Sequence, residues 1–137
     1  MGLIVDSNIL MGAERRGDTL GHAVRRVREI HGEQQFALSA IIIIELTHGI
    51  HRGRIPEYRE RRRIFVNEVC RDLTVIPVTL EIARLAGRIE GEQAAKGIGI
   101  PFEDLVIGST VLYLDFDVLT HNVKYFQLIP GLRAVTL

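Results

Sequence analysis

Residues 3–10, Leu-Ile-Val-Asp-Ser-Asn-Ile-Leu, contain the pattern that decides the fold. The aliphatic run Leu3–Val5 predicts a short buried strand. The polar residues Asp6–Asn8 that follow it favour a turn or the N-cap of a helix. The chain therefore starts with a strand that ends abruptly at an acidic residue and leads into a helix.

Short strands and longer helices alternate along the rest of the chain. Strands are expected at about 36–38, 73–78, 118–119 and 133–136, and helices at about 19–29, 40–51, 56–71, 80–95 and 101–114. The run Ile41–Ile44 has the β propensity of a strand, but it continues into Leu46 and Ile50 at helical spacing, so we expect a helix there. Strands separated by helices predict an α/β fold with a mainly parallel sheet of about five short strands.

Length and composition exclude several classes of protein. The 137 residues are enough for one domain, expected to span 1–137, and the mean hydropathy of +0.16 excludes a disordered chain. A single cysteine, Cys70, excludes an internal disulfide and a cysteine-based zinc cage. The 17 basic and 17 acidic residues give no net charge, so the chain lacks the broad basic field of most nucleic-acid binders. With no signal peptide or membrane span in the sequence, we expect a soluble cytoplasmic protein.

Three acidic residues and one asparagine fall where a ligand site is expected. Ligands of open α/β sheets bind at the carboxyl ends of parallel strands. Asp6 follows the first strand, Asn122 follows the strand at 118–119, Glu45 lies on the helix after the second strand, and Asp104 lies in the first turn of a later helix. Each of two acids also has a purely structural alternative. Asp6 could act only as a helix N-cap, and Asp104 could be an acid in the first helical turn that the helix dipole favours. Glu45, surrounded by apolar residues, is costly to desolvate unless it is paired or holds a cation.

Taken together, three carboxylates with open positions between them suit Mg²⁺ or Mn²⁺, which prefer oxygen ligands and keep several waters.

Four blocks of the chain stand out together: LIVDSNIL at 3–10, LSAIIIIELTHG at 38–49, IPFEDLVIGS at 100–109 and LTHNVKYF at 119–126. They resemble the four sequence blocks of PIN-domain proteins, in the same order and at the family's usual spacing. The closest subgroup in appearance is the VapC-type ribonuclease toxins of bacterial toxin–antitoxin pairs. The resemblance covers essentially the whole chain and implies a three-layer PIN-like fold.

The resemblance implies a site and an activity. Asp6, Glu45 and Asp104 match the family's three metal-holding acids, with Mg²⁺ as the expected metal and Mn²⁺ as a second possibility. Asn122 and Thr120 match the polar positions of the family's Thr-x-Asn loop. The implied reaction is metal-dependent hydrolysis of RNA, and the implied partners are an RNA substrate, a small antitoxin and a second copy of the chain. Ser7, Asn8 and Thr120 are the expected substrate-binding residues; helix capping is an alternative role for Ser7 and Asn8.

One position departs from the family's pattern. Many members have an acid three residues after the asparagine, where this chain has Tyr125. A neutral phenol does not replace a carboxylate as a metal ligand at pH 7. Glu103 precedes Asp104, but adjacent helical residues point about 100° apart, so Glu103 is not expected to be a direct ligand. A catalytically weakened PIN-like module that acts by binding protein or RNA is therefore the alternative to an enzyme.

Two further patterns have alternative interpretations. Arginines gather near the first long helix and on the helix at 56–71, where they suit phosphate or an acidic partner segment but also fit an ordinary solvated face. Glu45, His48 and His51 have the spacing of di-iron ligands, but no second Glu-x-x-His pair exists in the sequence.

Overall fold

The computed structural model describes residues 2–136, and its centre is a parallel sheet. Within those residues the sheet has five strands in the order β3-β2-β1-β4-β5, all neighbours being parallel. The strands are β1 (Gly2–Val5), β2 (Gln35–Ser39), β3 (Thr74–Ile76), β4 (Asp117–Leu119) and β5 (Ala134–Val135). The mainly parallel α/β fold expected from the sequence is confirmed.

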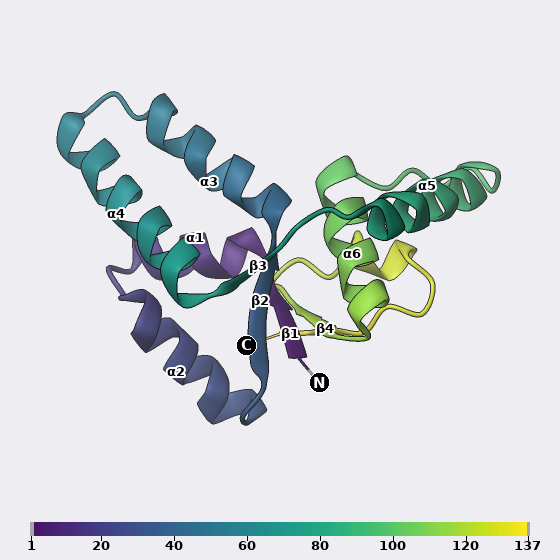
Figure 1. Ribbon diagram of the computed structural model, residues 1–137, viewed down its shortest axis with the longest axis horizontal. Helices are drawn as coiled ribbons and strands as arrows, with labels where there is room; N and C mark the ends of the chain where they lie inside the picture. Colours follow the sequence, from purple (N-terminus) through teal and green to yellow (C-terminus); the bar gives the residue numbers. More distant parts are fainter. Residues whose placement is uncertain (1, 137) are drawn as a thin grey trace.

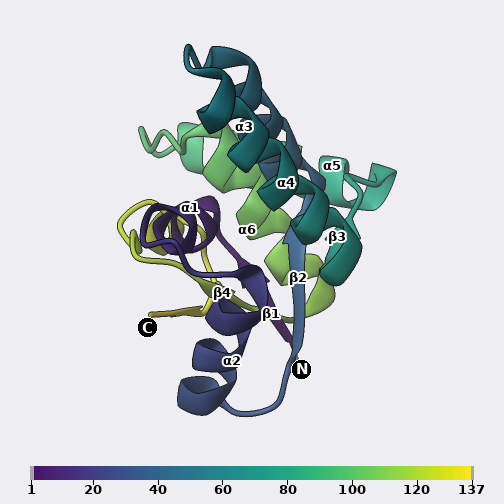
Figure 2. The same ribbon diagram turned by 90° about the vertical axis from the view of Figure 1, so that its left-hand side faces the viewer.

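Helices cover both faces of the sheet and make three layers (Figure 1). On one side lie α1 (Ser7–Arg15), α2 (Leu20–His31), α3 (Ala40–Arg52) and α4 (Pro56–Asp72), and on the other α5 (Leu80–Ala94) and α6 (Phe102–Leu114). The helices α3 and α4 form one projecting arm, and α5 with α6 forms a second, as the perpendicular view also shows (Figure 2). A short 3₁₀ helix, η1 (Phe126–Leu128), lies between β4 and β5.

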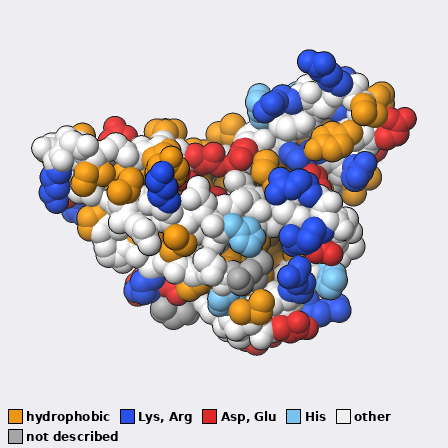
Figure 3. All heavy atoms as spheres, turned by 180° about the vertical axis from the view of Figure 1, so that it is seen from behind, with side chains coloured by type: hydrophobic (Ala, Val, Ile, Leu, Met, Phe, Trp, Pro, Cys, Tyr) orange, Lys and Arg blue, Asp and Glu red, His pale blue; other side chains and the backbone are white. Residues whose placement is uncertain are grey.

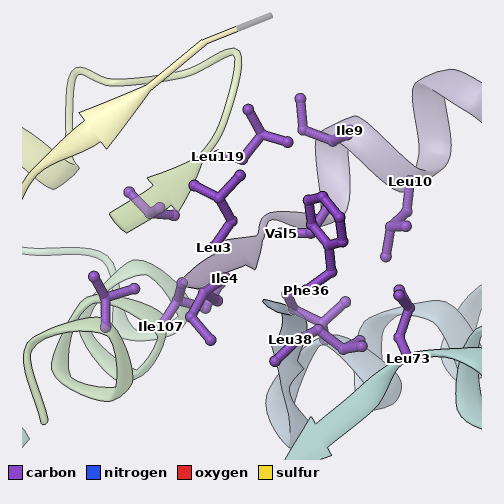
Figure 4. Packing of buried hydrophobic residues seen from close by; sticks show 14 of the residues in the cluster. Leu3, Ile4, Val5, Ile9, Leu10, Phe36, Leu38, Leu73, Ile107 and Leu119 are labelled. Carbon is purple, nitrogen blue, oxygen red and sulfur yellow. The ribbon is translucent and has the colours of Figure 1, made fainter. Parts of the chain in front are cut away.

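Side chains along each strand point alternately to the two faces of the sheet, so the hydrophobic core has two sides. Ile4 points toward Ile107 of α6, whereas Val5 and Phe36 lie toward Ile9 and Leu10 of α1 (Figure 4). All of these side chains are buried. Because successive strand residues face opposite sides, one aliphatic strand serves both helical layers. This explains why the central strands read as continuous hydrophobic runs in the sequence.

The main differences from the expected elements are small and local. The strand expected at 73–78 is only Thr74–Ile76, and the loop after β4 contains η1. Ile41–Ile44 is helical, as expected, because Ser39 caps α3 by accepting a hydrogen bond from the Ile41 amide, 3.3 Å away. No helix in residues 2–136 combines the length and the apolar character that crossing a bilayer requires.

The strand order places a topological switch point between β1 and β4. From β1 the chain proceeds outward to β2 and β3, and it then returns to the other side of β1 to form β4 and β5. The Asp6 amide donates to the Leu119 carbonyl, 2.9 Å away, so the ends of β1 and β4 are joined. In open α/β sheets this is where ligands bind.

Candidate active site

Asp6 lies at the switch point, buried to 6% exposure and held by a set of hydrogen bonds. Its Oδ1 accepts from the Ser7 amide at 2.7 Å, and its Oδ2 accepts from Thr120 Oγ1 at 2.8 Å and Asn8 Nδ2 at 3.3 Å. Asp6 is also the N-cap of α1, so the helix cap and the ligand interpretations of this residue both apply. These contacts fix the carboxylate in one orientation.

Asn8 and Thr120 connect this carboxylate to the loop after β4. Asn8 Nδ2 also lies 3.1 Å from Thr120 Oγ1, and Asn8 Oδ1 accepts from the His121 amide at 3.2 Å. The Asn122 amide donates to Thr120 Oγ1 at 3.0 Å. With no exposed surface and its hydroxyl fully engaged, Thr120 positions Asp6. Contact of Ser7, Asn8 or Thr120 with a substrate stays a prediction.

Three more carboxylates face Asp6 from two other helices. Glu45 lies in the middle of α3, and Glu103 and Asp104 lie in the first turn of α6, where the N-terminal end of the dipole favours acids. The charges of Asp6 and Glu45 both raise the pKa of Asp104, and those of Glu45, Asp6 and Asp104 raise that of Glu103. The fold therefore brings the three sequence-predicted acids together and adds Glu103.

Burial and mutual repulsion make it unfavourable for all the carboxyl groups of this cluster to be charged at once. Burial first, and then the negative charges of Asp6 and Glu45, raise the pKa of Asp104 to about 6. Burial, and then a hydrogen bond with the Glu45 carboxyl group, raise the pKa of Glu103 to about 8. Burial is also the largest cause of the raised pKa of Asp6. A bound cation would relieve all of these penalties.

Two buried carboxylate oxygens lie inside the cluster. Within residues 2–136, Glu45 Oε2 and Glu103 Oε1 have no hydrogen-bond partner apart from the contact between these two carboxyl groups themselves. A buried acceptor without a partner is costly, and an all-oxygen set of carboxylates is the ligand type that Mg²⁺ and Mn²⁺ prefer. The residues present therefore fit a hard divalent cation.

The carboxylates do not form a closed cage. Among the described residues, no group of three or more His, Cys, Asp or Glu side chains is arranged so that it could hold a metal ion in this conformation. Mg²⁺ usually keeps several waters and needs only one or two protein carboxylates, so an open set suits it. The same finding gives no support to the di-iron spacing of Glu45, His48 and His51.

The remaining sequence-predicted positions lie at the edge of the cluster. Asn122 is exposed, and no hydrogen bond of its side chain connects it to the acids in the described part of the chain. Tyr125 is half-buried at the start of η1, with Lys124 Nζ 5.4 Å from its ring centre. Glu103, which was not expected to be a direct metal ligand, lies close to Glu45, Asp6 and Asp104; whether it binds a metal directly stays a prediction. The dipeptide Glu103-Asp104 at a helix N-terminus was the available signal, because the longer glutamate side chain can reach back.

Comparison with known proteins agrees with this geometry. The family model described as PIN domain matches residues 3–131. The chain is 29% identical to Ribonuclease VapC1 of Rickettsia felis over 137 residues, which are 100% of this chain and 97% of that protein. It is 28% identical to Ribonuclease VapC of Rickettsia bellii, with the same coverage.

Solved structures show the same fold. VapBC2 from Rickettsia felis, bound to a DNA fragment from its promoter, superposes with a TM-score of 0.84 at 21% identity, covering 100% of this chain and 99% of that one. VapBC-1 from nontypeable Haemophilus influenzae gives 0.81 at 24% identity, covering 99% and 98%. A match to the family model over nearly the whole chain, on a fold whose switch point gathers the acids of the family's sequence blocks, shows that this chain belongs to the PIN-domain family.

Proposed function

We propose that this protein is a metal-dependent ribonuclease and the toxin of a toxin–antitoxin pair. The observation that supports it best is the convergence of Asp6, Glu45 and Asp104 at the switch point, with a buried oxygen of Glu45 left without a partner outside the cluster. The relatives named Ribonuclease VapC add the substrate class.

The proposed metal is Mg²⁺, or Mn²⁺ in its place, held by Asp6, Glu45 and Asp104. Glu103 faces the same space and offers a further oxygen. When bound, such a cation neutralises charge on the phosphoryl oxygens and lowers the pKa of a water bound to it. The hydrogen bonds from Ser7, Asn8 and Thr120 keep Asp6 oriented, so one ligand is in place before the cation arrives.

The protein's own groups have distinct proposed roles in hydrolysis of the phosphodiester. Glu45 is placed to orient the attacking water and accept its proton. The amide of Asn122 cannot act as a base, but it can donate a hydrogen bond to a phosphate oxygen from its exposed position. The partial positive charge at the N-terminus of α1, next to Asp6, favours an anionic phosphate nearby.

The proposed partners are a small antitoxin and a second copy of the chain, and the proposed place of action is the cytoplasm. VapBC-5 from Mycobacterium tuberculosis, whose solved structure has a similar fold, is described as a member of the VapBC family of toxin–antitoxin systems, and this supports the antitoxin proposal. Several apolar residues of α4 and α5 are covered within the chain, including Phe65, Val69, Ile82 and Ile89, and are not available to a second copy. Ile44, Leu80 and Phe102, at 69%, 61% and 69%, and Ile64 of α4, at 51%, are among the exposed apolar side chains that a second copy could cover.

The alternative of a weakened binding module rests on Tyr125. The presence of Glu103 among the acids favours the enzyme, because it restores a fourth carboxylate to the cluster. If the tyrosine position instead limits metal affinity, Tyr125→Asp will reach half-maximal activity at lower Mg²⁺. An unchanged Mg²⁺ midpoint in a folded variant argues that the position does not contribute.

A cleavage assay tests the proposal directly. A pool of structured RNAs is incubated with the protein and Mg²⁺ or Mn²⁺, and the product ends are mapped. Cleavage by the wild type, abolished by EDTA and by Asp104→Asn, is the expected result. If the wild type binds Mg²⁺ but leaves every RNA intact, the binding-module alternative replaces the enzyme.

A further inference from the structure

A trough runs away from the acidic cluster between α1, α3 and α4. Its first cavity, of ≈ 330 Å³, is lined by Glu45, His48, Arg52, Tyr58 and Arg62 among others. A second cavity, of ≈ 170 Å³, shares Tyr58 and Arg62 with the first and is also lined by Glu14, Arg15 and Arg61. We call this pair of cavities the α3–α4 trough. Because Glu45 lines one end, whatever binds at the acids can extend into it.

Arg62 lies in the floor of the trough, where Glu14 fixes its orientation and balances its charge. Its side chain is only 8% exposed, and its Nε lies 2.9 and 2.7 Å from the two carboxylate oxygens of Glu14. A side chain on Gly49 would overlap Arg62 Nη1, so the glycine makes room for the guanidinium beneath α3. The hydrogen bonds to Glu14 use only Nε. Arg62 lines the first cavity together with Tyr58, and because its Nη groups form no hydrogen bond to Glu14 they offer donors to an anion.

Positive charge continues along the face of α3 that bears Glu45. His48 and Arg52 follow Glu45 by three and seven residues, so they lie on the same face, with Arg52 about 10 Å along the helix axis. In residues 2–136, Arg52 forms no ion pair with a carboxylate. Lys and Arg side chains gather over the arm that carries α3 and α4, beside the notch where acidic side chains lie (Figure 3).

Tyr58 gives the trough an aromatic surface. The residue is 43% exposed, and the guanidinium carbon of Arg61 lies 5.8 Å from the centre of its ring. A half-exposed aromatic ring beside arginines is the arrangement by which proteins stack single-stranded bases while holding the phosphates.

We propose that the α3–α4 trough binds the single-stranded RNA segment on one side of the scissile phosphate, with Arg52 and Arg62 on backbone phosphates and Tyr58 stacked on a base. This inference rests on the proposed ribonuclease function. An acidic peptide matches the charge of the trough as well, but it offers no base for Tyr58. The trough also begins at Glu45, so the occupant is expected to continue from a phosphate held at the acids.

The binding test uses fluorescence anisotropy of a fluorescein-labelled, twelve-nucleotide single-stranded RNA. The Asp104→Asn variant in EDTA keeps the RNA intact. In this background, Tyr58→Ala is expected to weaken binding about fivefold or more, whereas Tyr58→Phe keeps the ring and the affinity. Arg52→Ala is expected to weaken binding and to reduce the slope of log affinity against log salt by about one. Arg88→Ala, on the exposed face of α5, is the matched control and should bind as the parent does.

The outcomes separate this inference from the proposed function. If Tyr58→Ala and Arg52→Ala bind the RNA like Arg88→Ala, or if no variant binds it, the trough is not the RNA path. Tighter binding of a labelled hexaglutamate peptide than of RNA, lost in Arg52→Ala, assigns the trough to a protein partner and overturns the proposal. RNA binding that depends on Tyr58 and Arg52 without any cleavage by the wild type refutes the ribonuclease alone. In the active chain, the same two substitutions are expected to raise KM while kcat is retained.

Discussion

Replacing Glu103 with glutamine is expected to stabilise the metal-free protein at alkaline pH. The pKa of Glu103 is raised from 4.5 to about 8, so the native state binds this proton more tightly than the unfolded chain does. Above pH 8 the charged carboxylate therefore destabilises the fold, and the penalty disappears as the pH falls toward 4.5. Glutamine is a neutral side chain of the same shape, so the Glu103→Gln variant lacks this penalty at every pH.

The size of the stabilisation follows from the pKa shift of Glu103, after a reduction for screening by solvent. A rise of this size in a fully buried group would correspond to about 5 kcal/mol at about 1.4 kcal/mol per pKa unit. Glu103 is only partly buried, and solvent screening reduces the penalty to about 1–2 kcal/mol. For a chain of this length, 1 kcal/mol shifts Tm by about 3–4 °C. The variant is expected to melt about 3–7 °C above the wild type at pH 9, and at the same temperature near pH 4.5.

Thermal melts followed by circular dichroism in EDTA, from pH 4.5 to pH 9, measure the difference. Glu90→Gln, at an exposed position of α5, is the matched control and should show no pH-dependent gain. Mg²⁺ at millimolar concentration should raise the Tm of the wild type more than that of Glu103→Gln, because the wild type has one more carboxylate near the cation. A variant that is no more stable than the wild type at pH 9, or whose gain is the same at both ends of the pH range, refutes the reasoning.

Three other outcomes are expected. The amide variants Asp6→Asn, Glu45→Gln and Asp104→Asn should each abolish RNA cleavage, measured by mapping the RNA ends, while circular dichroism shows that the chain stays folded. If a variant loses activity only because it unfolds, the catalytic assignment of that residue is contradicted. Glu14→Gln leaves the buried charge of Arg62 without its counter-ion and should cost about 3 kcal/mol, or about 10 °C in Tm. An unchanged Tm would mean that water hydrates the Arg62 guanidinium well enough to replace the lost ion pair with Glu14. Light scattering should give the mass of a dimer, and a monomer at every concentration up to high micromolar would exclude it.

Patterns that act over a few residues could be predicted from the sequence. The strand before Asp6 and the cap at Ser39 depend on neighbouring residues, so their positions follow from local chemistry. The helical assignment of Ile41–Ile44 followed from spacing, because the apolar positions continue beyond the run. The placement of the acids at one edge of the sheet followed from the parallel topology, which the alternation of strands and helices indicated.

Features that depend on side-chain reach or on distant partners could not be predicted in the same way. The angle between neighbouring helical residues separates Glu103 from Asp104 at the backbone, but the longer glutamate side chain reaches Glu45. The ion pair between Glu14 and Arg62 joins residues 48 positions apart, and no local pattern identifies it. The packing of α5 against α6, in which Ile89 is buried, likewise depends on partners that no local pattern identifies.

The hydrogen bond between Thr120 and Asp6 has a consequence for synthesis of the chain. The two residues are 114 positions apart, so the carboxylate reaches its final orientation only after β4 has docked beside β1. Chains fold from the N-terminus as they are made, and parallel pairings across long separations form slowly. A ribosome that has translated α1 to α5 therefore carries a chain in which Asp6 is present but not yet held by Thr120. The site is completed only after almost nine-tenths of the polypeptide has been made.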